Sequence, residues 1–469
     1  MKYSRPILII AFALSTTPLL AQLSYIGLDK IRTFDGYKKG WFSGGIIFFK
    51  GKYYFSTPNG NLFQTDGSMR GTVLLKTSQR DIVTLKATND WIYYTPDSGY
   101  NPQLQQFDPV SGADRGFKYT DLVMPSDRLC ESCEVPQSEV FVSADRSKVF
   151  IRNFGRGMQF INMIDDKAPE NQVTEVFKTS IPQAGITFQL IRGNTRVAEI
   201  RDEVYFNGTI NFADAKNVET SVTAFERVNG ATPSYKLLTD YRLKAKGIKL
   251  YPNFLRTAGA LYVIASKGDN EMFFMRVENA GLRQLASFPD KALGYTCFLL
   301  SGQIYATWKD KIYRYDEGTD NMVLLHQFSN SSLETVSGGV NLLKVGAYLM
   351  FRQDGVLRVL NEKTGKVDLL SATVAFPSPA KMDRLPIYAI AGKEVFYVLE
   401  ETAAGKILNQ YDPVRKTFIE VPLPAQKNET FVGYKYFQAA QDKLLILTEF
   451  KGKREKDPPL YKMFLYTEQ

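Results

Sequence analysis

The sequence predicts an all-β protein, a β-propeller of about eight or nine four-stranded blades closed by an N-terminal strand. Three observations favour this fold. Phe, Tyr and Gly number 32, 26 and 34 among 469 residues, a turn-and-strand unit recurs along the chain, and the repeat leaves incomplete units at both ends. Aromatic residues favour strands and glycine favours tight turns, so the composition indicates many short strands and few helices.

The recurring unit is a turn followed by a strand of large apolar residues. Nine copies begin at Gly51, Asn89, Arg146, Asp202, Gly259, Gly302, Gly346, Gly392 and Asp442. Eight steps from residue 51 to residue 442 give a mean period of about 49 residues, which is typical of propeller blades. Nine exceeds the usual range of about four to eight blades, so one unit is irregular or the chain forms something other than a single ring. One ring of eight or nine blades is the preferred interpretation.

The two ends of the repeat predict how the ring closes. The first unit divides into strands at 42–49, 53–56, 62–65 and 72–76, whereas the ninth runs out after its third strand at 460–466. Residues 23–34 precede the first unit without a partner. An N-terminal strand that completes the last blade removes the exposed edges, so residues 22–469 are expected to form a single propeller domain.

A second signature falls later in the units, where a strand ends at an Asp or Asn before a turn. The residues at this place are Asp66, Asp108, Asp316, Asn361 and Asp412. Their side-chain oxygens are suited to accept the backbone N–H groups that open a type I turn. We interpret them as turn residues and not as calcium ligands or catalytic acids, and this includes the acidic cluster at 316–320.

One segment resembles a known repeat. Residues 61–75, NLFQTDGSMRGTVLL, are similar to the E-L-W-x-T-D-G-T-x-x-G-T-x-L-V repeat of exported bacterial proteins, which is associated with β-propellers. The match occurs once and departs at Asn61, where the repeat has Glu, and at Phe63, where it has Trp. The resemblance implies a propeller fold and an exported bacterial protein, and it implies no catalytic residues.

The first 21 residues are typical of a signal peptide. Lys2 and Arg5 precede an apolar stretch at 7–14, and Leu19-Leu20-Ala21 forms a cleavage site, so the mature chain is expected to begin at Gln22. Cleavage leaves 56 Lys and Arg against 49 Asp and Glu, a net charge of +7 where the whole chain has +9. No other stretch predicts a membrane span. We expect a soluble protein in the periplasm or at the cell surface of a Gram-negative bacterium.

The cysteines and the single histidine limit the chemistry. Cys130 and Cys133 are expected to form a small disulfide in a loop, with a redox-active dithiol as a less favoured alternative. Zinc would need two further ligands that the sequence does not offer nearby, and Cys297 is interpreted as a buried apolar residue. His326, the only histidine, lies in an alternating strand and is interpreted as an edge or surface residue. We predict no metal, no cofactor and no catalytic residues.

Loop lengths indicate where a partner binds. The long segments at 121–137, 207–221, 375–383 and 451–459 belong to connections that lie on one face of a propeller. Their mixed charge favours a protein partner over a polyanion, and the basic run at 451–456 is interpreted as a solvated loop, so no nucleic acid is expected. Trp41, Trp91 and Trp308 are interpreted as packing between blades, although they also suit sugar-stacking platforms.

Two functions follow from these observations. The leading hypothesis is a non-catalytic, protein-binding scaffold that acts as a subunit of an outer-membrane complex or another cell-envelope assembly. The alternative is a glycan-binding or glycan-degrading propeller, because a pair of carboxylates about 5–9.5 Å apart suffices for glycoside hydrolysis and leaves no local signature. Two carboxylates that face each other across the central channel would favour the alternative, and a channel filled by apolar side chains would count against it.

Overall fold

The computed structural model describes residues 22–25 and 46–467, apart from short internal segments. Those segments are 58–59, 79–81, 97–102, 119–138, 144, 156–157, 168–172, 179–185, 191–196, 201–202, 214–218, 230–234, 238–245, 279–280, 290–294, 329–334, 337–338, 341, 354–355, 371–386, 390–394, 403–404, 424–428, 441–442 and 454–459.

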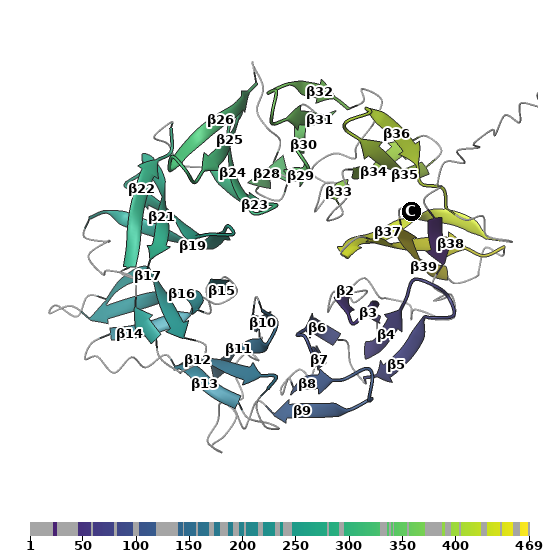
Figure 1. Cartoon of the computed structure of the whole chain (residues 1–469), viewed down its shortest axis with the longest axis horizontal. Coiled ribbons are helices and arrows are strands. Elements are labelled where there is room, and N and C mark those ends of the chain that lie inside the picture. Colours follow the sequence, from purple (N-terminus) through teal and green to yellow (C-terminus); the bar gives the residue numbers. More distant parts are fainter. Residues whose placement is uncertain are drawn as a thin grey trace, which may run out of the picture.

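The described residues form 39 strands and no α-helix. Eight four-stranded antiparallel sheets and one five-stranded sheet form the blades, and Figure 1 shows them arranged in a ring. A two-stranded hairpin, β27 (Thr335–Val336) and β28 (Gly339–Val340), belongs to the connection between blades 6 and 7. The predicted propeller is confirmed.

Each blade runs from an inner strand at the channel to an outer strand at the rim. The inner strands of blades 1 to 9 are β2 (Ile46–Phe49), β6 (Ile82–Ala87), β10 (Glu139–Val142), β14 (Ile186–Leu190) with β15 (Val197–Ile200), β19 (Ile248–Arg256), β23 (Thr296–Leu300), β29 (Leu343–Val345), β33 (Ile387–Ala389) and β37 (Thr430–Ala440). The second strands are β3 (Lys52–Thr57), β7 (Ile92–Pro96), β11 (Lys148–Gly155), β16 (Glu203–Ala213), β20 (Leu261–Lys267), β24 (Gln303–Trp308), β30 (Tyr348–Gln353), β34 (Phe396–Thr402) and β38 (Lys443–Lys451).

The third strands are β4 (Asn61–Thr65), β8 (Gln103–Phe107), β12 (Met158–Asp165), β17 (Glu219–Asn229), β21 (Glu271–Glu278), β25 (Lys311–Asp316), β31 (Val356–Asn361), β35 (Gly405–Asp412) and β39 (Leu460–Thr467). The outer strands are β5 (Val73–Thr77), β9 (Asp114–Lys118), β13 (Val173–Lys178), β18 (Tyr235–Leu237), β22 (Gly281–Ser287), β26 (Asn321–Gln327), β32 (Val367–Leu369), β36 (Thr417–Glu420) and β1 (Gln22–Tyr25).

All nine predicted turn-and-strand units are second strands. A second strand is flanked by strands on both sides, and both faces of its sheet pack against neighbouring blades. In β3, for example, every residue after Lys52 is buried. A strand buried on both faces carries a nearly continuous apolar run, which explains why these segments were the clearest repeat in the sequence.

The N-terminal strand closes the ring as predicted. β1 pairs antiparallel with β39, in a register that joins Gln22 to Thr467 and Tyr25 to Phe464. The last blade therefore takes three strands from the C-terminal end of the chain and its outer strand from the N-terminal end. This pairing removes the exposed outer edge that β39 would otherwise present.

Blade 4 is the irregular unit. Its inner position is shared by two segments, since β15 pairs with the first half of β16 and β14 with the second half. The predicted long loop at 207–221 is wrong for most of its length, because β16 and β17 pair continuously from Glu203–Asn229 to Ala213–Glu219. The Asn207-Gly208 pair is a turn signal in isolation, but here it lies within a strand whose β-branched and aromatic residues favour pairing.

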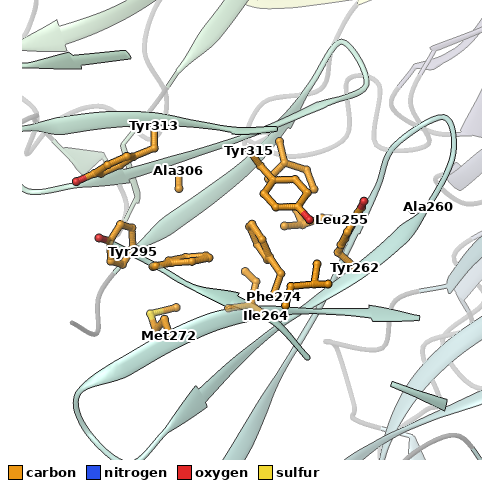
Figure 2. Packing of buried hydrophobic residues seen from close by; sticks show 13 residues of the cluster. Leu255, Ala260, Tyr262, Ile264, Met272, Phe274, Tyr295, Ala306, Tyr313 and Tyr315 are labelled. Carbon is orange, nitrogen blue, oxygen red and sulfur yellow. The ribbon is translucent and has the colours of Figure 1, made fainter. Parts of the chain in front are cut away.

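The core consists of seams between blades. The largest described seam joins blades 5 and 6 (Figure 2) and contains edge-to-face aromatic pairs such as Tyr262 with Tyr315, whose ring centroids lie 5.3 Å apart. Figure 2 shows Tyr295 and Tyr313 at one end of this seam and Tyr262 and Tyr315 at the other. Aromatic packing of this kind stabilises a pair by about 0.5–1.5 kcal/mol beyond the burial of its area.

Candidate functional site

The antiparallel order of the strands gives the ring two different faces. Turns between first and second strands and between third and fourth strands lie on one face, which we call the short-turn face. Connections between second and third strands, and from each blade to the next, lie on the other, which we call the long-connection face. The two faces carry different chemistry.

The short-turn face is built from side chains that bind their own turns. Each predicted turn residue accepts the backbone N–H two positions later, at 2.8 Å in Asp66 and Asp412, 2.9 Å in Asn361 and 3.0 Å in Asp108 and Asp316. Asp165 does the same at 2.9 Å and is a sixth member that the sequence interpretation missed. These residues are confirmed as turn residues.

The segment that resembles the exported repeat is explained by this turn. The hydroxyls of Thr65 and Thr72 lie 2.8 Å apart, the Ser68 hydroxyl donates to Asp66 at 2.8 Å, and the Gly71 N–H donates to Ser68 Oγ at 2.9 Å. Hydrogen bonding to the Ser68 side chain holds the pKa of Asp66 below its ordinary value. The polar residues of this segment therefore form the hydrogen-bonded turn between β4 and β5.

Buried tyrosines join neighbouring blades near the same face. Tyr93 of blade 2 donates its hydroxyl to Asp166 of blade 3 at 2.7 Å and accepts a hydrogen bond from Gln106 at 2.8 Å. Burial, reinforced by the Asp166 carboxylate, raises the pKa of Tyr93 far above its ordinary value, and burial also raises the pKa of Asp166. These groups cross-link the seam, and Tyr93 titrates too high to serve as an acid or base near neutral pH.

A second such contact joins blades 6 and 7 through Lys344, which forms an ion pair with Glu362 of its own blade 7 and hydrogen bonds to two residues of blade 6. The Lys344 ammonium donates to Glu362 at 2.5 Å, to the Tyr305 hydroxyl at 2.6 Å and to Gln303 at 3.1 Å. The side chains of Lys344 and Glu362 are only 8% and 6% exposed. The buried ammonium needs these three acceptors, because it loses its hydration on burial. We interpret these four side chains as a structural contact that stabilises the seam between blades 6 and 7.

The long-connection face was the predicted binding surface, and much of it lies outside the described residues. Outside the described residues lie the predicted loops at 121–137 and 375–383, and also the signal peptide, Trp41 and the Cys130–Cys133 disulfide. Of the loop at 451–459, Lys451 is the last residue of β38, and 454–459 fall outside the described part.

A cluster of aromatic and cationic side chains occupies the described part of this face at blades 5 and 6. We call it the Trp308 cluster, and it consists of Lys249, Tyr251, Trp308, Lys309 and Lys311. Trp308 is the last residue of β24, and the turn 309–310 leads from it into β25. Tyr251 and Trp308 both pack, half-buried, against the seam between the two blades.

Trp308 stands in a cross-strand row. Tyr295, just before the inner strand β23, stacks on it with centroids 5.7 Å apart and an interplanar angle of 17°. On the other side, Lys311 of β25 is its register partner. The Lys309 and Lys311 ammonium groups lie 4.5 and 5.3 Å from the Trp308 ring centroid, and that of Lys249 lies 5.6 Å from Tyr251. Packing predicted for Trp308 is thus present, together with three cations that the sequence did not single out.

The other singled-out residues occupy structural positions. The Trp91 ring carries the Arg115 guanidinium 4.8 Å from its centroid, within blade 2. His326 lies on the outer strand β26, where Nδ1 is 3.1 Å from the Gly365 carbonyl oxygen. Cys297 is half-buried and unpaired on β23, and burial raises the pKa of its thiol to about 12. A thiol with that pKa is a poor nucleophile near neutral pH.

The inner strands bear on the glycan alternative. Among the described inner strands the carboxylates are Glu139, at the start of β10, and Glu199, near the end of β15. Inner strands run from the long-connection face to the short-turn face, so these two positions lie toward opposite faces. The described residues contain no group of three or more metal-binding side chains, and no helix within them has the length and apolar character for a membrane crossing.

Comparison with known proteins identifies the fold. No protein-family model and no curated protein matches the sequence. Dipeptidyl peptidase 4 of Porphyromonas gingivalis superposes with a TM-score of 0.51 at 11% identity, over 90% of this chain and 66% of the peptidase, so the chain spans about two thirds of that protein's length. Sqt1 of Saccharomyces cerevisiae gives 0.42 at 11% identity (86% and 100% covered), and the Dos1 propeller gives 0.42 at 10% (95% and 95%). Such identities show the fold alone.

Proposed function

We propose that the protein is an exported, non-catalytic β-propeller that binds a protein partner on its long-connection face, as a subunit of a cell-envelope assembly. The observation that carries this proposal is the difference between the two faces. The polar side chains of the short-turn face bind their own turns and seams, whereas the Trp308 cluster presents exposed cations beside half-buried aromatic rings. Tyrosine and tryptophan in such surroundings are typical of protein interfaces.

Export is supported by the position of the closing strand. The residues of β1, Gln22–Tyr25, follow the expected cleavage site, so cleavage there leaves them available to pair with β39. The segment at 61–75, with its resemblance to an exported bacterial repeat, supports the same location. N-terminal sequencing of the protein from its own cells is expected to give a chain that begins at Gln22 or within a few residues of it; an intact Met1 would contradict export by cleavage.

The partner is tested by affinity isolation of the tagged protein from its own membranes in mild detergent, followed by quantitative mass spectrometry. A stoichiometric partner that stays bound to the purified protein during gel filtration supports the scaffold. Recovery of the protein alone, together with binding on a glycan array, would instead favour the glycan alternative. The placement of Glu139 and Glu199 toward opposite faces argues against a paired hydrolytic site on those strands.

A further inference from the structure

We propose that an acidic, aromatic-containing segment of the partner protein docks on the Trp308 cluster, with its carboxylates against Lys249, Lys309 and Lys311. This inference rests on the proposed function and names the chemistry of the partner at that face.

The charge of the cluster is unbalanced. Lys249 and Lys309 are exposed, and neither forms an ion pair within the part of the chain that the structure describes. Asp310, which lies in the turn between Lys309 and Lys311, accepts a hydrogen bond from Gln327 at 3.1 Å. The cluster therefore attracts an anionic partner, because complementary charge both steers association and fixes the orientation of the complex.

The backbone holds Lys309 in an uncommon conformation. Its φ is 50°, in the left-handed region that favours Gly, Asn or Asp at a hairpin turn. A lysine at this position adds strain to the turn, and its ammonium group lies 4.5 Å from the centroid of the Trp308 ring. Lys50 and Lys416 adopt the same conformation in turns of the short-turn face, so it is the charge of the Trp308 cluster, and not this conformation, that favours an anionic partner.

The groups that pack over the Trp308 ring favour binding of an acidic peptide over stacking of a sugar ring. A stacking platform needs an open aromatic face, but Trp308 is stacked on Tyr295 and carries two ammonium groups within 5.3 Å of its centroid. An incoming group thus meets cations first and the half-buried edges of Trp308 and Tyr251 beside them. A segment that alternates carboxylates with aromatic side chains satisfies both, as interface hot spots rich in Trp and Tyr do.

The test measures binding of a short synthetic peptide of alternating Glu and Phe by isothermal titration calorimetry. The double variant Lys249→Glu, Lys309→Glu is expected to lower the peptide's affinity by at least about tenfold, because reversed charges repel the carboxylates. The matched control is Lys167→Glu, Lys363→Glu, which makes the same change in net charge at two exposed lysines of the short-turn face. The control is expected to stay within about twofold of the unchanged protein.

A further variant separates binding from folding. Lys309→Gly removes the strain at this position, because glycine adopts a left-handed φ freely. The variant is therefore expected to keep or raise the melting temperature of the protein while lowering its affinity for the peptide. Equal loss in both double variants, or no loss in either, would overturn the inference, as would tight binding of oligogalacturonate without binding of the peptide. If the membrane partner binds both double variants equally, the docking site is wrong and the scaffold function stands; if no partner is isolated, the scaffold function itself fails.

Discussion

At the scale of single residues, the ring depends on polar side chains at fixed places. In six blades a buried tyrosine of the second strand is paired in register with Gln or Arg of the third; the pairs are Tyr54–Gln64, Tyr93–Gln106, Tyr205–Arg227, Tyr262–Arg276, Tyr305–Arg314 and Tyr397–Gln410. In blade 2 this cross-strand residue bonds the tyrosine, since Gln106 donates to the Tyr93 hydroxyl at 2.8 Å. This alternation is visible in the sequence once the register is known.

Gly71 is a residue whose size matters. A Cβ added there would lie 2.0 Å from Asp66 Oδ1, so Gly71→Ala forces the carboxylate out of the turn it caps. We expect a loss of about 1 kcal/mol in unfolding free energy, comparable to the loss of a helix cap, measured by thermal denaturation. Gly433→Ala is the control, because a Cβ at Gly433 meets nothing within 4 Å. Equal melting temperatures for the two variants would contradict this account of the turn.

The turn carboxylates predict how stability depends on pH. The Ser111 hydroxyl, and then the Val110 N–H, hold the pKa of Asp108 below its ordinary value. A carboxyl group with a lowered folded pKa stabilises the fold above its unfolded pKa of about 4, and this contribution is lost as pH falls through the lowered value. Asp108→Asn keeps an acceptor oxygen, as Asn361 does, and removes the titration.

Asp108→Asn is therefore expected to unfold with a weaker dependence on pH below about 4, measured by urea denaturation at a series of pH values. Asp269→Asn, in an exposed turn where the carboxylate accepts no hydrogen bond from the described residues, is the control. If both variants follow the unchanged protein through this range, the turn hydrogen bonds contribute no measurable linkage.

At the scale of elements, losing one charge of the buried Lys344–Glu362 pair is expected to destabilise the fold more than losing both. Lys344→Met leaves Glu362 buried without its ammonium partner, at a cost of about 3–5 kcal/mol. Adding Glu362→Leu is expected to restore much of this stability, since a neutral pair needs no hydration. Denaturant unfolding of the two single variants and the double variant measures the coupling, and additive losses would show that the two side chains do not act as a pair.

The closing strand β1 is the strand whose removal is expected to open the ring. A chain that begins at Gln22 is expected to unfold in one transition, whereas a chain that begins at Ile26 lacks β1 and leaves the outer edge of β39 unpaired. We expect the shorter chain to melt several degrees lower and over a broader range in differential scanning calorimetry. Identical transitions for the two chains would refute closure by this strand.

Many of the strands and turns could be predicted from the sequence. The second strands were predictable because burial on both faces gives them continuous apolar runs, and the third-strand turns because Asp and Asn cap them. The β16–β17 hairpin was not, since Asn207-Gly208 signals a turn locally while pairing along the whole of β17 decides the outcome. The Trp308 cluster was missed because Lys249 is distant in sequence and joins it only through the packing of blades 5 and 6.

At the scale of the whole molecule, nine blades make a wide ring (Figure 1). Its two faces differ in the side chains that they carry. Seam contacts such as Tyr93–Asp166 and Lys344–Tyr305 hold neighbouring blades together near the short-turn face. A rigid ring presents the opposite face in a fixed geometry, which lowers the entropic cost of binding a partner. The central claim is that this long-connection face is where the partner binds.

Hydrogen–deuterium exchange of the protein, alone and saturated with the membrane partner that co-isolates with it, tests this claim most directly. We predict slower exchange in the partner complex at 246–251 and 306–311, with the short turns at 66–71, 108–112 and 361–365 unchanged. Protection of those short turns, with 246–251 and 306–311 unaffected, would contradict it and place the partner on the other face.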